Sequence, residues 1–573
     1  MKKTKCQIGC SVFFLILGLL FIGSGIFLWV GFYKIYDKAV DNTLVLQADK
    51  DDGQLSKTTF WFVHPPVTAI SHYHFFHVKN PSDIEFFGQK PWVEDVGSFA
   101  IHDLANKWNY SFNEDGTRMK YKNYQTYIYN KNDSCGDCDY DRVITLPNLV
   151  GIGTIEELLD PKYNISTMEA QLIDLFMLLV GEYAFIDVKV GDILFDGYED
   201  AMLSAAHSRL LDDLAELNNG KSIIPVPVPD MKTMAMFYHY NNTNDEEYEV
   251  HTGKDDVTKV GQITKWANSE KLPDLWWNDE QAKRLRGSDN GGFQTPRLTK
   301  ETRVELFQSF MCRSFDLGFT SEEKVGDIPT YKFEGGAENF DTTLPEQAGF
   351  RYPNTESINY FTDWPLCPTL SPTVTASNCT KLDCSRTENM CNPCCSGSYI
   401  NETYQLPPGF YPINCYPGRV QETPFRLLFS TPHFASSPPE VRNSIRGLKE
   451  LGASKHPFSF KYLPRIGACL EANIRFQIAI PIYNTEYSIM LSHMPNKIVP
   501  VLWADNHVKM NDNAYNKFYE GFVVVPRVVT VLRYVLPSVG VLFVLIGIVI
   551  LVVKGKSDSL EVSTVVSRTV SKL

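Results

Sequence analysis

The chain has 573 residues, of which 44% are apolar and 13% aromatic, and its formal net charge is −13. A chain so rich in apolar residues has ample material for a packed core, which excludes disorder throughout. The acidic balance and the absence of a clustered stripe of Lys and Arg argue against a protein that binds nucleic acid by neutralising its phosphates.

Residues 11–31 predict a first transmembrane helix. They include no charged residue, and at about 1.5 Å per residue their length matches a hydrocarbon core of about 30 Å. A cleaved signal peptide would have a shorter apolar region followed by small residues, whereas Phe32, Tyr33 and Lys34 follow here. We therefore expect a retained anchor, preceded by a cytoplasmic N-terminus of residues 1–10.

Two cysteines, Cys6 and Cys10, lie beside this first span. A cytoplasmic cysteine next to a membrane helix is a candidate for palmitoylation, and the alternative is an unmodified thiol. Within the span, Gly18 and Gly25 lie seven residues apart and share one helix face. Such a face predicts close packing, either with the second span or in a homo-oligomer, unless it reflects only the ordinary glycine content of membrane helices.

Residues 32–533 are predicted to form one extracellular or lumenal domain. Six sequons for N-glycosylation fall in this range, at Asn109, Asn132, Asn164, Asn241, Asn378 and Asn401. Eleven of the 13 cysteines also fall there, which is typical of a disulfide-bonded domain in an oxidising compartment.

The local pattern within this domain predicts a strand-dominated fold with a helical insertion. Short runs of aromatic and β-branched residues predict strands at residues 59–63, 72–78, 121–129, 235–240, 248–252 and 474–482. Helical periodicity is found at residues 152–159 and 167–179, where Leu172, Leu175, Phe176 and Leu179 recur on one face.

The cysteines of the domain predict plain disulfides rather than a redox or zinc site. Cys135 and Cys138 are spaced to close a local loop, and a Cys-rich region at residues 367–415 contains Cys367, Cys379, Cys384, Cys391, Cys394, Cys395 and Cys415. With Cys312, the cysteines of this region number eight and allow 105 connectivities, and Cys469 is left over. The Cys-x-x-Cys spacings at Cys135 and Cys391 also suit a redox motif and half a zinc site, but the compartment favours disulfides.

No catalytic constellation is found, and we expect neither an enzyme nor a cofactor. The sequence lacks a Gly-x-Ser-x-Gly elbow, a His-Glu-x-x-His helix and a Gly-rich phosphate loop. The cluster of His72, His74 and His77 is interpreted as ordinary surface or packed histidines rather than a metal site, because on a strand His77 faces away from the other two.

Residues 534–553 predict a second transmembrane helix, followed by a cytoplasmic tail of residues 554–573. Lysines flank both spans on their outer sides, at residues 2–5 and 554–556, which places both ends in the cytoplasm. The tail ends in Ser571-Lys572-Leu573. Ser571 and Leu573 suit a PDZ adaptor; a peroxisomal address or an incidental tail is the alternative.

Several blocks of this sequence resemble the class B scavenger receptors, the family of fatty acid translocase and lysosomal integral membrane protein type 2. The blocks are Asn80-Pro81, Gly88-Gln89-Lys90-Pro91, Glu94-Asp95-Val96-Gly97, Leu146-Pro147-Asn148, Gly197-Tyr198-Glu199-Asp200, Thr252-Gly253, Gly287-Ser288-Asp289, Cys312-Arg313-Ser314 and Ser430-Thr431-Pro432-His433-Phe434. The last block is the most specific. The resemblance covers nearly the whole chain, including both anchors.

The resemblance implies an α+β, membrane-anchored protein with a large antiparallel β-barrel-like ectodomain, a helical apex at residues 152–200 and a disulfide between Cys312 and Cys415. It also implies binding of lipids, namely fatty acids, sterols or phospholipids, or of lipoprotein-like particles, with passage of lipid through an ectodomain tunnel to the membrane. The plasma membrane is the expected location. The alternative is a lysosomal or endosomal membrane protein that traffics an enzyme, although the tail lacks an acidic-dileucine or tyrosine sorting signal.

The expected apex is strongly acidic. Residues 152–200 include only two lysines, Lys162 and Lys189, but eleven acidic residues, among them Glu156, Glu157, Glu169, Asp174 and Glu182. We predict that these carboxylates make the apex prefer neutral lipid, cationic ligands or a basic partner over anionic particles. The alternative is that they only solvate a helix face.

Overall fold

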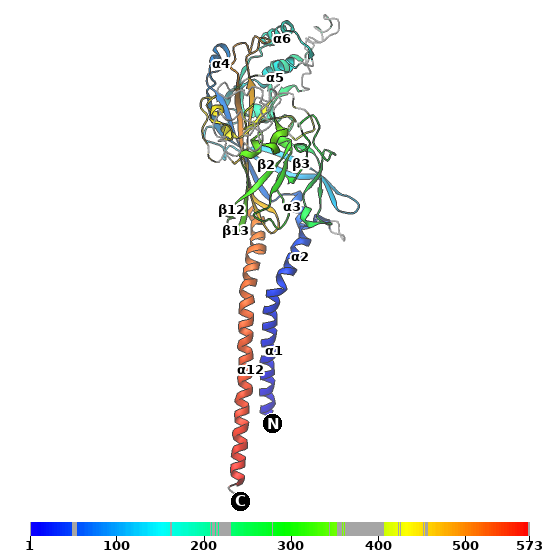
Figure 1. Ribbon diagram of the computed structural model, residues 1–573, viewed down its shortest axis with the longest axis vertical. Coiled ribbons are helices and arrows are strands. Elements are labelled where there is room, and N and C mark those ends of the chain that lie inside the picture. The colour runs from blue at the N-terminus through cyan, green and yellow to red at the C-terminus, as the bar shows by residue number, and fades with distance from the viewer. Residues whose placement is uncertain are drawn as a thin grey trace, which may run out of the picture. The chain divides into compact units, whose positions relative to one another are not determined.

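The structure is a computed structural model (Figure 1). It describes residues 2–48, 54–160, 163–206, 208, 213, 216, 231–277, 279–342, 344–351, 358, 360, 406–416, 418–421, 423, 426–450, 452 and 456–570. The chain divides into two compact units, which are described separately. Unit 1 comprises residues 1–44, 326–328 and 512–573, and unit 2 comprises residues 45–325 and 329–511.

Unit 1 consists mainly of helices from the two ends of the chain. They are α1 (Lys2–Val30), α2 (Phe32–Leu44), α11 (Asp512–Tyr519), the π-helical turn η12 (Glu520–Val524) and α12 (Val525–Val570). Two segments, Ile8–Val30 and Asp512–Val552, are long and apolar enough to cross a membrane. The predicted spans at residues 11–31 and 534–553 fall almost wholly within these segments.

The glycine faces of unit 1 pack α1 against α12. A Cβ at Gly18 would lie 2.7 Å from the carbonyl oxygen of Gly540, whereas a Cβ at Gly23 would meet nothing within 4 Å. The Ser11 hydroxyl donates to the carbonyl of Gly547 at 2.7 Å. Small residues permit this close approach because they place no bulky side chain between the helices. Close packing matters in a membrane, since lipid removes the hydrophobic drive for helices to associate. Of the two predicted uses of these faces, the structure contains the pairing of the two spans.

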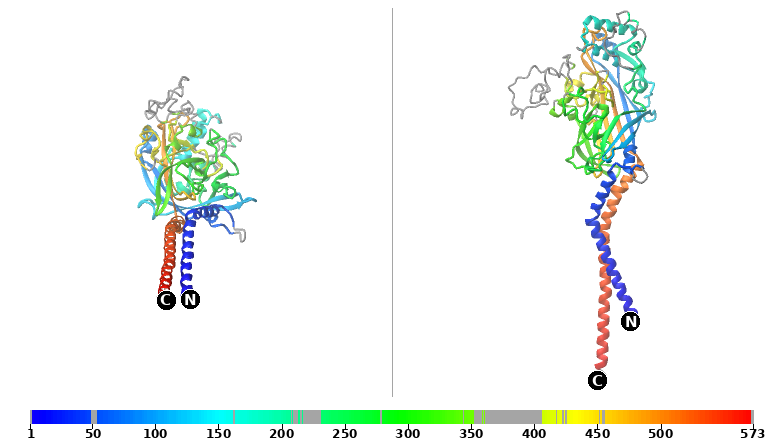
Figure 2. Two further views of the ribbon diagram at one scale, coloured as in Figure 1. Left: turned by 60° about the horizontal axis from the view of Figure 1, so that its bottom comes forward. Right: turned by 90° about the vertical axis from the view of Figure 1, so that its right-hand side faces the viewer.

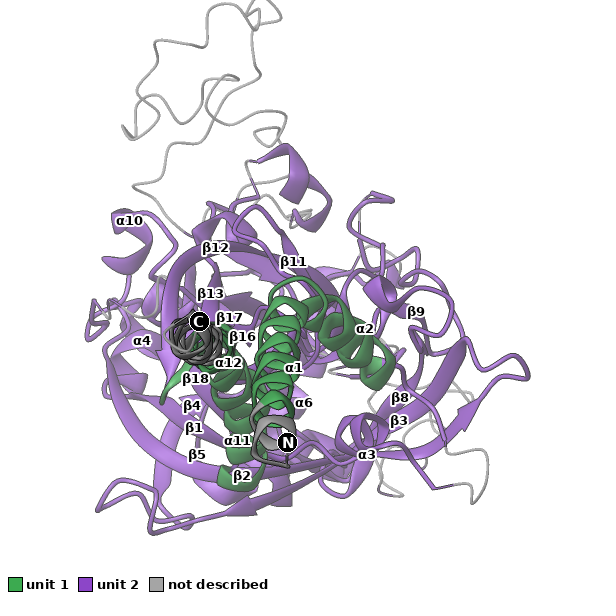
Figure 3. Cartoon of the chain, turned by 90° about the horizontal axis from the view of Figure 1, so that it is seen from below, with its two compact units in different colours: residues 1–44, 326–328, 512–573 green, residues 45–325, 329–511 purple. Residues whose placement is uncertain are grey.

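Unit 2 is built on one large sheet that curls around on itself (Figure 3). Its strands are joined in the order β10, β11, β12, β13, β16, β17, β18, β1, β2, β3, β8 and β9, with β15 added to β17 and β14 to β15. Their bounds are β1 (Val67–Val78), β2 (Val93–Phe112), β3 (Arg118–Tyr129), β8 (Thr243–His251), β9 (Ile263–Trp266), β10 (Ser288–Asp289), β11 (Val304–Gln308), β12 (Arg313–Val325), β13 (Ile328–Gly335), β14 (Phe410–Pro412), β15 (Leu428–Ser430), β16 (Phe458–Leu463), β17 (Ala468–Ile482) and β18 (Lys497–Met510).

The two ends of this sheet meet, which makes it a nearly closed barrel. Gln262, just before β9, forms a bridge with Ser288 of β10, and the Ile263 N–H donates to the Gly287 carbonyl at 2.9 Å. β10 pairs with β11 in parallel, and the other neighbouring pairs whose register is described are antiparallel. The predicted antiparallel, barrel-like ectodomain is therefore confirmed.

Shorter elements complete unit 2. The small strand pairs are β4 (Val143–Pro147) with β5 (Phe185–Lys189), and β6 (Tyr198–Glu199) with β7 (Thr233–Met234). The helices are α3 (Lys57–Val63), α4 (Pro81–Phe87), α5 (Leu149–Leu158), α6 (Thr167–Val180), α7 (Ala201–Ala206) and α10 (Pro439–Arg442), with single turns η2 (Asp192–Asp196), η3 (Val257–Lys259), η4 (Ser309–Met311), η5 (Ala337–Phe340), η6 (Pro345–Phe350) and η10 (Pro432–Phe434).

Two predicted strands were wrong. Residues 59–63 are helical, because the Ser56 hydroxyl accepts a hydrogen bond from the Thr59 N–H and caps helix α3, whose Phe62 packs edge-on against Tyr121. Residues 235–240 form turns rather than a strand, and His239 there has a positive φ of 55°. Aromatic content misled both assignments, since aromatic residues are favoured in strands only where they pack on a sheet face.

Candidate functional site: the helical apex

Helices α5, α6 and α7, called the apex from here on, lie toward the end of unit 2 away from α3 (Figure 1). Asn148 caps α5 by accepting hydrogen bonds from the N–H groups of Val150 and Gly151. Ser166 and Glu169 form a reciprocal capping box at the start of α6, and Gly181 ends it with a positive φ of 98°. The predicted helices at residues 152–159 and 167–179 are confirmed.

One face of α6 is apolar and exposed. Met168, Leu172, Leu175 and Leu179 recur at helical spacing, and the exposed fractions of Met168, Leu172 and Leu179 are 70%, 59% and 78%. These four residues are called the apolar row. Tyr183, just beyond α6, is also exposed. The buried face is made by Ala170, Ile173, Asp174 and Met177 instead.

Asp174 fastens α6 to the loop between β17 and β18. Its Oδ2 accepts hydrogen bonds from the Ser488 hydroxyl at 3.1 Å, the Met490 N–H at 3.0 Å and the Ile489 N–H. Burial raises the pKa of Asp174, although these three hydrogen bonds oppose the shift. The long paired strands β17 and β18 (Figure 2) are joined by this loop, so they position the residues to which α6 is hydrogen-bonded.

A pair of buried carboxyl groups joins all three helices of the apex. Glu182 accepts hydrogen bonds from the Asn148 side chain and from the Met202 N–H at 3.1 Å, and Asp200 accepts from the Leu203 N–H at 2.9 Å. The two carboxyl groups also interact with each other electrostatically, and burial raises the pKa of both. Burial and the charge of Asp200 raise the pKa of Glu182 to about 8.

The prediction of a ligand-facing acidic surface was wrong for three of the five residues. Glu156, Asp174 and Glu182 are buried, because they belong to the interior of the apex. Glu157 is half-buried and accepts a hydrogen bond from the Tyr163 hydroxyl at 3.0 Å. Glu169 is exposed but belongs to the capping box. Four exposed carboxylates remain in this stretch, on Glu169, Asp187, Asp196 and Glu199.

The most specific sequence block forms a buried corner around Asp95. His433 is fully buried, its Nε2 lies 3.0 Å from Asp95 Oδ2, and its Nδ1 accepts from the Lys449 N–H at 3.0 Å. His74 Nδ1 lies 3.1 Å from Asp95 Oδ1. Burial alone would raise the pKa of Asp95, but the hydrogen bonds with His433 and His74 hold it well below its usual range. Because both ring nitrogens of His433 are hydrogen-bonded, this histidine holds the corner together.

A second polar network lies inside the sheet. Asp289 Oδ2 accepts hydrogen bonds from Lys107 at 2.8 Å and from Asn123 at 3.0 Å, and Asn123 also donates to Asp245 at 3.2 Å. Burial and neighbouring carboxylates raise the pKa of Asp245 and of Asp103 to about 7. Sequence reasoning missed this network because its members come from strands far apart in the chain.

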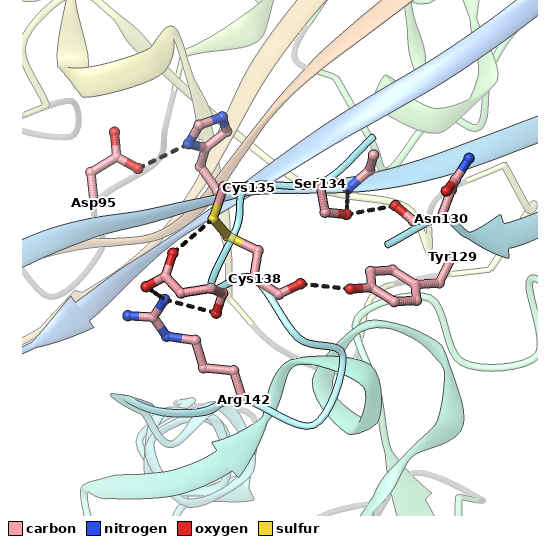
Figure 4. The surroundings of a disulfide bond; sticks show 10 residues. Asp95, Tyr129, Asn130, Ser134, Cys135, Cys138 and Arg142 are labelled. Atoms are coloured by element: carbon pink, nitrogen blue, oxygen red, sulfur yellow. Dashed lines mark hydrogen bonds and ion pairs between the residues drawn. A yellow bond between two sulfur atoms is a disulfide. The ribbon is translucent and has the colours of Figure 1, made fainter. Parts of the chain in front are cut away.

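Two disulfides lie in the described part of unit 2. Cys135 is bonded to Cys138 in the loop after β3, where Arg142 donates to Asp137 and the Tyr129 hydroxyl donates to the Cys138 carbonyl (Figure 4). Cys312 is bonded to Cys415. Cys469 is a half-buried free thiol, and burial raises its pKa to about 12, which lowers the fraction of the reactive thiolate form.

The remaining predicted site residues are placed as follows. Asn109, Asn132, Asn164 and Asn241 are exposed. Cys10 is an exposed free cysteine on α1, and the main chain of Cys6 is part of the same helix. Outside the described residues lie Cys367, Cys379, Cys384, Cys391, Cys394, Cys395, Asn378, Asn401, Lys162, Ser571 and Leu573.

Comparison with known proteins decides the family. The sequence profile of the CD36 family matches residues 15–551. The chain belongs to the CD36 family. Among its relatives are an uncharacterized protein of Caenorhabditis elegans, 34% identical and covering 92% of this chain and 94% of that protein, and lysosome membrane protein 2 of Mus musculus, 25% identical with 92% of each covered. Scavenger receptor class B member 1 of Mus musculus is 23% identical, covering 84% of this CD36-family chain and 79% of that protein.

Proposed function

We propose that this CD36-family membrane protein is a receptor that binds lipids or lipoprotein-like particles at its apex and passes lipid to the membrane. The observation that carries the proposal is the apolar row of α6. Exposed leucines are ordinary when single, but Met168, Leu172, Leu175 and Leu179 make a continuous stripe on a helix that is already packed on its other face. Because the described part of the fold leaves this stripe exposed, the stripe suits contact with an apolar surface.

The surroundings of the row favour a neutral lipid surface over an anionic one. Glu169 is exposed on the same helix, and Lys189, on β5, is paired with Asp141 at 3.0 Å. Uncompensated carboxylates near a docking surface repel anionic ligands within about 8 Å at physiological salt. The charge effect is smaller than the sequence predicts, because four of the eleven acidic residues are buried.

A route for lipid is proposed through the nearly closed sheet of unit 2. A sheet that closes on itself can shield an apolar interior from water, and the two candidate spans of unit 1 would hold the chain in a bilayer. The family relationship supports the receptor part of this proposal. Palmitoylation of Cys6 and Cys10 and a PDZ adaptor at Ser571 and Leu573 stay predictions.

We propose the plasma membrane as the location and a lysosomal or endosomal membrane as the alternative, since one relative is named a scavenger receptor and another a lysosome membrane protein. Imaging of a tagged chain separates them. Residence with lysosomal markers would favour the alternative.

The test of the proposal compares lipid uptake by cells that express the full chain or its variants. Replacing Leu172 and Leu179 together by Glu should reduce uptake of fluorescent neutral lipid from lipoprotein-like particles at least fivefold, because charges at both positions disfavour contact with lipid. Leu275→Glu is the matched control, since Leu275 is 85% exposed on a loop between β9 and β10. Equal uptake by the double variant and the control at equal surface expression would contradict the proposal.

A further inference from the structure

The sequon at Asn241 has an unusual place in the fold. The Tyr127 N–H donates to Asn241 Oδ1 at 3.0 Å, and Asn241 Nδ2 donates to the Tyr127 carbonyl at 3.2 Å. Both polar atoms of this side-chain amide therefore pair with the main chain of one residue. Opposite residues in an antiparallel ladder exchange two hydrogen bonds in the same way.

The register of the sheet explains this pairing. Strands β3 and β8 pair Gln125 with Thr243, so continuing the ladder two residues further brings Tyr127 opposite Asn241. The main chain departs from the strand conformation here, where His239 and Asn242 have positive φ angles of 55° and 58°. The side-chain amide of Asn241 thus substitutes for a main-chain peptide at the end of the ladder.

A glycan on Asn241 is incompatible with this pairing. The unmodified side-chain amide of Asn241 can bond to the N–H and the carbonyl of Tyr127 at once, because one of its two N–H bonds lies on the same side of the amide as Oδ1. Glycosylation makes the amide secondary, and a trans secondary amide places the substituent on the oxygen side and its remaining N–H on the opposite side. The cis alternative is strongly disfavoured. The sugar would therefore occupy the position of the Tyr127 carbonyl.

The third residue of the sequon is also held by the fold. The Thr243 hydroxyl donates to the carbonyls of His239 and Tyr240 at 3.0 Å and accepts from Arg419 at 3.0 Å. In contrast, Asn109, Asn132 and Asn164 have exposed side chains whose amides make no hydrogen bond with any other described residue.

We propose that Asn241 ends the β3–β8 ladder as an unmodified side chain, and that Asn109, Asn132 and Asn164 are the sequons of the described ectodomain that carry glycans. The Asn241–Tyr127 pairing and a glycan on Asn241 exclude each other in one folded molecule, and the folded protein has the pairing.

Site occupancy is the first test. The full chain, produced in cells with a secretory pathway, is deglycosylated by peptide N-glycosidase in ¹⁸O water and analysed by mass spectrometry. We expect labelled Asp at positions 109, 132 and 164 and unlabelled Asn at 241. Labelling of position 241 in most folded molecules would overturn the proposal. Thr243→Ala should accordingly leave the gel mobility unchanged, whereas Ser111→Ala should remove one glycan.

Hydrogen exchange of the Tyr127 main-chain amide tests the Asn241–Tyr127 pairing independently of which sequons are glycosylated. Asn241→Ala should increase the hydrogen-exchange rate of the Tyr127 amide at least tenfold, since that amide loses its acceptor. Asn109→Ala is the control and should leave this rate unchanged. An unchanged Tyr127 rate in Asn241→Ala would show that the pairing does not form and would also overturn the proposal.

Discussion

Glu182 and Asp200 are both buried in the interior of the apex, where they accept hydrogen bonds from the neighbouring main-chain N–H groups of Met202 and Leu203 and so link the end of α6 to the start of α7. Burial and the charge of Asp200 both disfavour ionisation of Glu182, so Glu182 retains its proton to a higher pH than a carboxyl group in water. The fold of the apex therefore depends on pH.

The pH dependence has a definite sign. The pKa of Glu182 is raised from 4.5 to about 8, so between these values the folded chain retains a proton that the unfolded chain releases. Its contribution to stability is complete below about pH 4.5 and is lost as the pH rises through 8. Glu182 should therefore lower the free energy of unfolding by on the order of 1 kcal/mol per pH unit from pH 5 to pH 8, and the midpoint of thermal unfolding should fall over the same range.

Glu182→Gln should remove the part of this slope between pH 7 and 8, because Asp103 and Asp245, with pKa values of about 7, titrate mostly below that interval. Glu169→Gln is the control, since the exposed Glu169 has a lowered pKa from its hydrogen bonds with Ser166. An identical slope in Glu182→Gln and the wild type between pH 7 and 8 would contradict the raised pKa of Glu182.

Asp174→Ala should loosen α6 from the β17–β18 loop. The change leaves the Ser488 hydroxyl and two main-chain N–H groups without their acceptor, and each buried unsatisfied group costs roughly 1–3 kcal/mol. Hydrogen exchange of residues 488–491 should accelerate and the thermal midpoint should fall. Asp174→Asn retains one acceptor oxygen and should have a smaller effect; equal effects would argue against the anchoring role.

Gly18→Leu should separate the two spans. A side chain at this position collides with the main chain of Gly540, whereas Gly23→Leu enters open space. Phe14 and Phe543 have ring centroids 5.8 Å apart, so cysteines at these two positions should cross-link in the Gly23→Leu chain and poorly in the Gly18→Leu chain. Efficient cross-linking in both would show that the glycine face does not set the helix packing.

Ligand charge provides a further prediction. The exposed carboxylates on and near the apex should make the purified glycosylated protein bind neutral or cationic liposomes more tightly than anionic ones of the same acyl chains, and the difference should shrink as salt rises. Replacing Asp187, Asp196 and Glu199 by their amides should reduce the difference. Equal binding to anionic and cationic liposomes at low salt would exclude a role of these residues in ligand choice.

The sequence predicted the spans, the helices of the apex and the barrel-like sheet, because each depends on local patterns or on family resemblance. It did not predict which face of α6 is buried. The leucine spacing identifies an apolar face, but the partner of the other face, the loop at Ser488 to Met490, lies more than 300 residues away.

Burial of charge was equally hard to foresee. Glu182 and Asp174 are acidic residues on a helical segment, for which solvent exposure is the ordinary expectation. Their burial follows from donors brought to them by the fold, at Asn148 and Met202 for Glu182. The sequon at Asn241 also looked like the other five until the register of β3 and β8 placed it opposite Tyr127.

Photo-cross-linking at the apolar row tests the central claim most directly. A photoreactive amino acid at Leu179 of the full chain, with the same group at Leu275 as the control, is illuminated in the presence of particles that contain labelled neutral lipid. Both positions are highly exposed, so the two differ in lipid contact rather than in accessibility. The account predicts strong labelling at position 179 and background labelling at 275. Equal labelling at the two positions would contradict lipid capture by α6.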